Sequence, residues 1–124
     1  MSERYDTGRK VRREVLGDAH VDRADAARTE FDAAFQEMIT EGAWGTLWAR
    51  DAIPRRERSM LTLALLAALG NWEELELHLR ATAQTGASRE DVLEVFLHVA
   101  VYAGVPRANS AIRIAKEVFA EMDR

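Results

Sequence analysis

The sequence contains no cysteine among its 124 residues. Disulfide bonds, thiolate nucleophiles and cysteine-ligated metal sites are therefore excluded. It also lacks a run of about 18 apolar residues that could cross a bilayer, and it lacks a charged segment followed by an apolar leader. We therefore expect a soluble, cytoplasmic protein that does not enter a membrane.

An excess of positive charge is missing as well. The chain has 17 lysines and arginines against 21 aspartates and glutamates, which gives a net charge of −4. Domains that bind nucleic acid are usually strongly basic, so we expect no nucleic-acid partner. Basic side chains are nevertheless concentrated near the N-terminus, which is compatible with a small anionic ligand: Arg4, Arg9, Lys10, Arg12 and Arg13.

Alternating apolar and polar residues, which would indicate β-strands, are absent, and helical spacing dominates. The pattern predicts an all-α fold of five to six helices in a single domain over residues 1–124, with a flexible arm over residues 1–8. A chain of this length forms only a small core, so we expect it to gain stability as a homo-oligomer.

Local signals place the expected helices. Apolar spacing predicts them over about residues 9–16, 23–40, 54–69, 71–86, 88–104 and 107–122. Gly17, Gly70 and Gly86 stand where a helix commonly ends. The stretch Met60–Leu69 is apolar almost all round apart from Thr62, which is typical of a buried central helix.

Other local patterns refine this picture. Three capping patterns mark helix starts: Asp22-x-x-Asp25, Asn71-x-x-Glu74 and Ser88-x-x-Asp91. Trp44 and Trp48 lie four residues apart, so a short helical turn would place both indoles on one side.

The helix expected over residues 71–86 contains the best candidates for chemistry, centred on His78. Glu74 lies one turn before His78, on a mostly apolar stripe that includes Leu75 and Leu79. A titratable pair that faces inward is a candidate acid–base site. A hydrogen-bonded core histidine is the structural alternative for His78, and Glu74 is equally well placed to cap the helix after Asn71.

A set of motifs spread along the chain carries a resemblance: Val11–Arg23, Trp44-Gly-x-x-Trp48, Arg58-Ser59, Asn71-x-x-Glu74-x-x-x-His78, Gly86 and Tyr102-Ala-Gly-Val-Pro106. Together they resemble the carboxymuconolactone decarboxylase family, over roughly the whole chain. Relatives in the wider alkylhydroperoxidase D-like superfamily carry two cysteines for thiol redox chemistry. This chain has Asn71 and Glu74 at those positions, so that chemistry is excluded.

The resemblance implies an alkylhydroperoxidase D-like helical fold, assembly as a trimer or hexamer, and decarboxylation of 4-carboxymuconolactone to β-ketoadipate enol-lactone in protocatechuate catabolism. In this small anionic lactone, the departing carboxylate is vinylogously attached to the lactone carbonyl, so its loss leaves a dienolate. The substrate supplies its own electron sink, and we expect neither a metal nor an organic cofactor. The protein must supply cations for the carboxylates, a donor at the lactone oxygen and an acid for the dienolate carbon.

Under this interpretation, His78 protonates the dienolate, and Glu74 favours the charged form of the imidazole. Arg12 and Arg58 are the expected carboxylate clamps, because a guanidinium stays charged and offers two parallel hydrogen bonds. Arg13, Arg23 and Arg107 are further candidates. The remaining predicted substrate contacts are aromatic or histidine side chains: Trp44, Trp48, His20 and His98.

Several of these side chains, and the function itself, have a second interpretation. The tryptophans also suit core filling, and His20 also suits a loop. His98 shares a stripe with Val95 and Tyr102, which favours an inward orientation. A non-catalytic helical assembly module would explain the small size, but not why His78, Glu74 and several arginines converge. A related cofactor-free lyase that acts on another carboxylactone or on a β-keto acid would share every feature, because its specificity depends on pocket shape.

Overall fold

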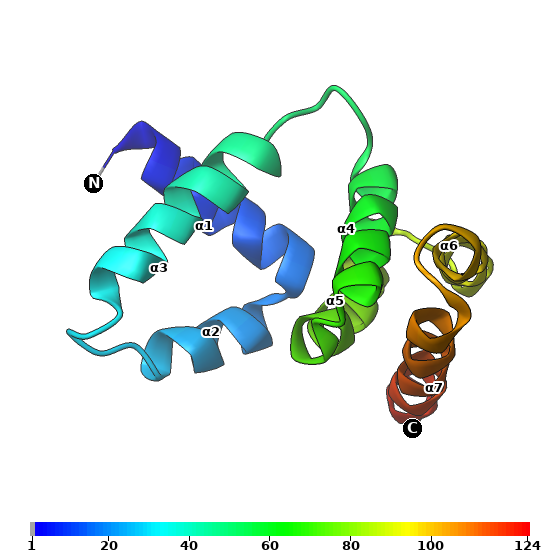
Figure 1. The fold of residues 1–124 in the computed structure, drawn as a ribbon. Coiled ribbons are helices and arrows are strands. Elements are labelled where there is room, and N and C mark those ends of the chain that lie inside the picture. Colours follow the sequence, from blue (N-terminus) through cyan, green and yellow to red (C-terminus); the bar gives the residue numbers. More distant parts are fainter. Residues whose placement is uncertain (1) are drawn as a thin grey trace. The chain divides into compact units, whose positions relative to one another are not determined.

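The computed structural model describes residues 2–124, and helices joined by short connections dominate this range (Figure 1). The helices are α1 Glu3–Leu16, α2 Asp18–Ala26, α3 Ala33–Ile39, the π-helix η1 Thr40–Leu47, α4 Arg55–Leu69, α5 Trp72–Thr85, α6 Arg89–Tyr102 and α7 Val105–Met122. No strand occurs in the described range, so the all-α prediction is confirmed, with seven α-helices instead of five to six. None of these helices is long and apolar enough to span a bilayer.

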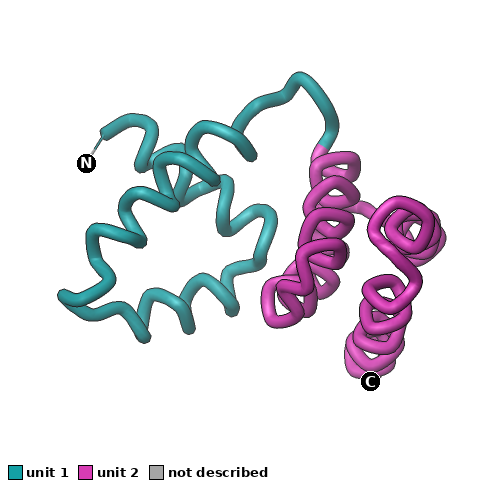
Figure 2. Tube along the Cα trace, in the orientation of Figure 1, with its two compact units in different colours: residues 1–54 teal, residues 55–124 magenta. Residues whose placement is uncertain are grey.

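The chain divides into two compact units, residues 1–54 and residues 55–124 (Figure 2). Each unit has its own helix packing, and the boundary falls between Pro54 and Arg55. A single domain over residues 1–124 stays a prediction.

In the first unit, α1 packs against η1, and two glycines allow a close approach (Figure 1). A Cβ atom on Gly8 would lie 2.0 Å from the carbonyl oxygen of Thr40, and one on Gly45 would lie 2.1 Å from that of Arg4. No side chain fits in such a space. The two helices therefore meet backbone against backbone.

The N-terminal segment is helical. The Ser2 hydroxyl accepts a hydrogen bond from the backbone N–H of Tyr5 at 3.0 Å, and this cap starts α1 at Glu3. The flexible arm expected over residues 1–8 is therefore wrong from residue 3 onwards, and Met1 lies outside the described residues. The end of α1 is as predicted, because Gly17 follows it with a φ of 88°.

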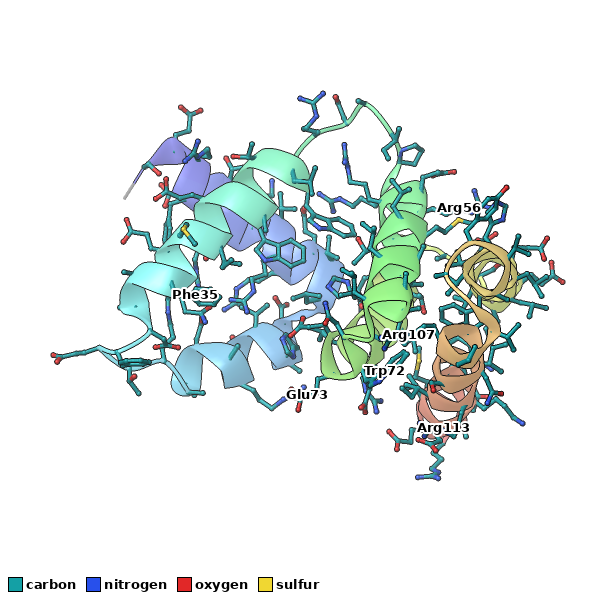
Figure 3. All side chains as sticks on the ribbon, viewed as in Figure 1. Phe35, Arg56, Trp72, Glu73, Arg107 and Arg113 are labelled. Carbon is teal, nitrogen blue, oxygen red and sulfur yellow. The ribbon has the colours of Figure 1, made fainter. Side chains whose placement is uncertain are left out.

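The helix expected over residues 23–40 is wrong, because the structure divides it. α2 ends at Ala26, and α3 begins only at Ala33. Asp22 and Asp25, interpreted as a capping pair, accept hydrogen bonds from arginines of α1 instead. The side chains that suggested one continuous helix are largely exposed, as Phe35 illustrates (Figure 3): Phe31, Phe35 and Met38.

The second unit consists of two helical hairpins, α4–α5 and α6–α7, which share one apolar core. The predicted capping box at Ser88 and Asp91 is present and starts α6, and Gly86 ends α5 in the left-handed conformation as expected. The core draws on all four helices: Leu63, Ala67, Leu75, Leu79, Val92, Val95, Phe96, Val99, Ala108, Ala111, Ile114, Ala115 and Val118.

α4 is not the fully buried helix that its composition predicted. One side, with Leu63 and Ala67, is buried in the core, but Leu61, Leu65 and Leu69 are each more than half exposed. These three leucines repeat every four residues and so form an apolar stripe along one side of the helix. A helix that is apolar all round can be covered partly by its own chain and partly by another molecule.

An ion pair joins the beginnings of α4 and α6. Arg56 donates to both carboxylate oxygens of Asp91, at 2.8 and 2.6 Å (Figure 3). The Arg56 guanidinium holds the pKa of the Asp91 carboxyl well below its usual range, and the backbone N–H of Ser88 acts in the same direction. Asp91 thus serves the α6 cap and the contact between the hairpins together.

Candidate active site

Buried polar side chains are concentrated on the α4–α5 hairpin. Arg58 and Ser59 on α4 are 9% and 0% exposed, and His78, Thr82 and Thr85 on α5 are 7%, 7% and 8% exposed. We call these five residues the hairpin polar strip. Burying polar groups costs free energy unless they form hydrogen bonds, so each of these side chains needs a partner in the protein or in a ligand.

On the α4–α5 hairpin, the residues of the hairpin polar strip lie at similar heights along the helix axes. α4 and α5 pack against each other and are joined by Gly70 and Asn71 alone, so residues equally far from this connection lie at the same height. By this count Ser59 is level with Thr82, and His78 lies one turn nearer the connection, about 6 Å along the helix axis. The members of the strip therefore lie within a few turns of one another along the hairpin.

His78 is buried, as the apolar stripe predicted, but Glu74 is not. Glu74 is exposed one turn before His78, and its carboxylate makes no hydrogen bond or ion pair with any described residue. The inward-facing pair that the spacing suggested is therefore wrong for Glu74. The capping role weighed for Glu74 is not observed either, and Asn71, the N-cap residue, makes no side-chain capping hydrogen bond.

In the first unit, the neighbouring arginines of α1 differ in their partners. Arg9 donates two hydrogen bonds to Asp25, at 3.0 and 2.9 Å, and Arg13 bonds to two other aspartates of α2. Arg12 makes no ion pair within residues 2–124, and its Nε is buried without a hydrogen-bond partner. Burial lowers the pKa of the Arg12 guanidinium, while Asp25 opposes this shift. Arg12 is thus a half-buried cation without an anion.

The other predicted contacts in the first unit are the two tryptophans and His20. Trp44 and Trp48 are buried and stacked, with ring centroids 5.4 Å apart, so the expectation that both indoles share one side is confirmed. Such burial suits core filling and a pocket wall alike. His20 lies within α2, partly buried, and not in the loop that we weighed as an alternative.

His98 and Arg107 have surface positions. His98 is exposed, stacks on Tyr102 with ring centroids 5.7 Å apart, and lines an open groove between α4 and α6, so the inward orientation considered for it is wrong. Arg107 lies over the Trp72 ring, 5.9 Å from its centroid (Figure 3). A Cβ atom on Gly70 would lie 2.0 Å from Nη1 of Arg107, so this guanidinium packs on the α4–α5 connection.

The sequence reading missed Ser59 and Thr85. Ser59 follows Arg58 in one of the recognised motifs, and Thr85 lies one turn after Thr82 on the buried side of α5, so motif and periodicity together could have marked them. Within residues 2–124, no group of three or more histidines, aspartates and glutamates is arranged to hold a metal ion.

The chain is similar in sequence to known enzymes of one protein family. Residues 33–117, from α3 through most of α7, match the sequence profile of the carboxymuconolactone decarboxylase family. The chain belongs to this family. It is 42% identical over 120 residues to 4-carboxymuconolactone decarboxylase of Acinetobacter baylyi, covering 97% of this chain and 90% of that protein. It is 40% identical over 118 residues to nitrosuccinic acid decarboxylase of Metarhizium robertsii, covering 95% and 82%.

A shorter match agrees with these. Over 43 residues, or 35% of this chain, the identity to 4-carboxymuconolactone decarboxylase of Pseudomonas putida is 58%, and the match covers 90% of that sequence. The resemblance found in the motifs is thus confirmed, and so is the enzyme class: this member of the carboxymuconolactone decarboxylase family is a decarboxylase.

Replacing Arg9 and Arg12 by methionine should affect stability differently. Arg9→Met removes a bidentate ion pair whose side chains are 29% and 27% exposed, and should lower the free energy of unfolding by about 1 kcal/mol. Arg12→Met removes a half-buried charge that has no ion pair, and should leave the stability unchanged or raise it. Urea unfolding followed by circular dichroism measures both. Equal losses in the two variants would contradict the distinction between these arginines.

Proposed function

We propose that this enzyme converts 4-carboxymuconolactone to β-ketoadipate enol-lactone, a step in the protocatechuate branch of aromatic catabolism. The observation that carries the proposal is the 42% identity to the Acinetobacter baylyi enzyme over 97% of the chain. The burial of Arg58 and His78 on one hairpin supports it, because a carboxylate clamp and a proton donor are both required.

The reaction breaks the bond between the ring carbon and its carboxylate. The electron pair of that bond moves through the ring double bond to the lactone carbonyl oxygen, and CO2 leaves. The resulting dienolate is protonated at the carbon next to the lactone carbonyl, which places the remaining double bond at the carbon that lost CO2. The protein therefore has to hold the carboxylates, stabilise the oxygen that gains charge and deliver one proton.

The proposal assigns these tasks to named side chains. On the α4–α5 hairpin, His78 delivers the proton and Arg58 holds a carboxylate. Arg12, in the first unit, stays a predicted carboxylate contact. Trp44, Trp48, His20 and His98 stay predicted substrate contacts, and His98 lies in the open groove between α4 and α6. Solvent screens the exposed Glu74, so we assign it only a weak influence on the charge of His78.

A second candidate substrate is nitrosuccinic acid, since the identity to the Metarhizium robertsii enzyme is nearly as high, at 40%. Loss of CO2 from the carbon that bears the nitro group would transfer the electron pair to the nitro oxygens, and protonation of that carbon would follow. The protein would again have to hold the carboxylates, stabilise the oxygens that gain charge and deliver one proton. Cations for the carboxylates, a donor and an acid suit both compounds.

The deciding experiment incubates purified, chelator-dialysed protein with each compound and follows CO2 release, together with the ultraviolet change of the lactone. We expect turnover of the lactone without added metal or organic cofactor. Turnover of nitrosuccinate alone would favour the second candidate. Absence of CO2 from both would contradict the proposed function and favour a non-catalytic assembly module.

Replacing His78 by alanine should lower kcat roughly 10²–10⁴-fold, the usual contribution of a positioned proton donor, and leave the Michaelis constant within a few-fold. Glu74→Gln serves as the comparison and should change kcat far less, because Glu74 is exposed. Steady-state kinetics on protein whose folding has been checked by circular dichroism gives both values. Near-normal kcat in His78→Ala would assign the proton to another group.

We also propose that the active form is a homo-oligomer, a trimer or a hexamer. On α4 and α6, apolar side chains of the second unit are exposed at intervals of four residues. This pattern is expected of helices that pack against another protein. We propose that a second copy of this chain packs against these exposed side chains. The exposed residues are Leu61, Leu65 and Leu69 on α4, and Leu93, Leu97 and Val101 on α6.

Placing a charge on this surface should dissociate the assembly. Sedimentation of the wild type should give a multiple of 14.0 kDa, and Leu65→Glu or Leu97→Glu should shift it towards that mass, because a buried unpaired carboxylate is costly. Lys116→Glu, on an exposed position of α7, is the control and should leave the mass unchanged. A fully active wild-type monomer would contradict the proposal.

A further inference from the structure

Two hydroxyl groups of the hairpin polar strip have no hydrogen-bond partner. Ser59 is completely buried and Thr85 nearly so, yet neither Oγ of Ser59 nor Oγ1 of Thr85 bonds to any described atom. A buried polar group without a partner is rare in folded proteins, because its lost hydration is not replaced. Such groups therefore require an explanation.

Neighbouring hydroxyls on the same two helices form hydrogen bonds to backbone carbonyl oxygens. The Thr62 hydroxyl donates to the carbonyl oxygen of Arg58 at 2.8 Å, and the Thr82 hydroxyl donates to that of Leu79 at 2.6 Å. Both bonds close within a single helix. Ser59 and Thr85 could form the same kind of bond but do not, so each hydroxyl keeps an unused donor.

We infer that the Ser59 hydroxyl is the donor to the substrate oxygen that receives the electron pair during decarboxylation, an inference that rests on the proposed function. No other residue has been assigned to that task. Ser59 directly follows the proposed carboxylate clamp Arg58, and it lies about one turn from the level of the proposed acid His78. One hairpin then carries the clamp, the donor and the acid within about two helical turns.

The chemistry suits a neutral hydroxyl. The hydrogen bond from Ser59 to the substrate oxygen strengthens as negative charge develops there, so it stabilises the transition state more than the bound substrate. No proton is transferred from Ser59, and the proton that completes the reaction goes to carbon. The same donor would serve an oxygen of a nitro group, which also gains charge when CO2 leaves.

Ser59→Ala and Thr62→Val form a matched pair on α4. We expect Ser59→Ala to lower kcat by roughly 10²–10³-fold, as removal of one such donor does, with the Michaelis constant within a few-fold. Its melting temperature should stay the same or rise, because the lost hydroxyl had no partner in the free protein. Thr62→Val loses only a bond within its own helix and should keep the wild-type kcat.

The outcomes separate this inference from the proposed function. Wild-type turnover of the lactone with an unchanged kcat in Ser59→Ala overturns the inference alone. A lower melting temperature with unchanged turnover per folded molecule also overturns it, because Ser59 would then be structural. If the wild type acts only on nitrosuccinate, the same pair is measured with that acid. If it releases CO2 from neither acid, both the function and the inference are wrong.

Discussion

The hairpin polar strip depends on the apolar core of the second unit, which holds α4 and α5 together. Leu63 and Ala67 on α4 and Leu75 and Leu79 on α5 are fully buried, and their packing against α6 and α7 holds the hairpin together. Each buried hydroxyl without a partner costs about 1–3 kcal/mol, which this core has to offset. The arrangement is typical of enzymes, in which a stable scaffold keeps polar groups ready for a ligand at some expense in stability.

The sequence predicted best where a local interaction decides the structure. The capping box at Ser88 and Asp91 and the left-handed Gly86 need only a few neighbouring residues, and both are observed. Asp22 and Asp25 of α2, by contrast, form ion pairs with the distant arginines Arg13 and Arg9 of α1. Their spacing fits a cap equally well, so local pattern alone favoured the wrong role.

In the candidate site, too, the sequence predicted some features correctly and others wrongly. The burial of His78 follows from its stripe, whereas Glu74, one turn away in the first turn of α5, is exposed although it shares the stripe. Similarly, the composition of α4 indicated full burial, but composition does not tell whether the same chain or a second molecule covers each side. The free hydroxyl of Ser59 depends on its side-chain rotamer, which no sequence pattern encodes.

The two candidate substrates share a feature that connects these observations. Both carry two carboxylates, and both place developing charge on an oxygen bound to an unsaturated centre. Two of the neighbouring arginines of α1 are neutralised by aspartates of α2, whereas Arg12 forms no ion pair within residues 2–124. Arginine is the side chain that this chemistry favours for a carboxylate. Recognition of a dicarboxylate, together with a donor and an acid, is general enough for either compound. Discrimination between them then depends on the apolar and aromatic side chains that shape the site rather than on its charged groups.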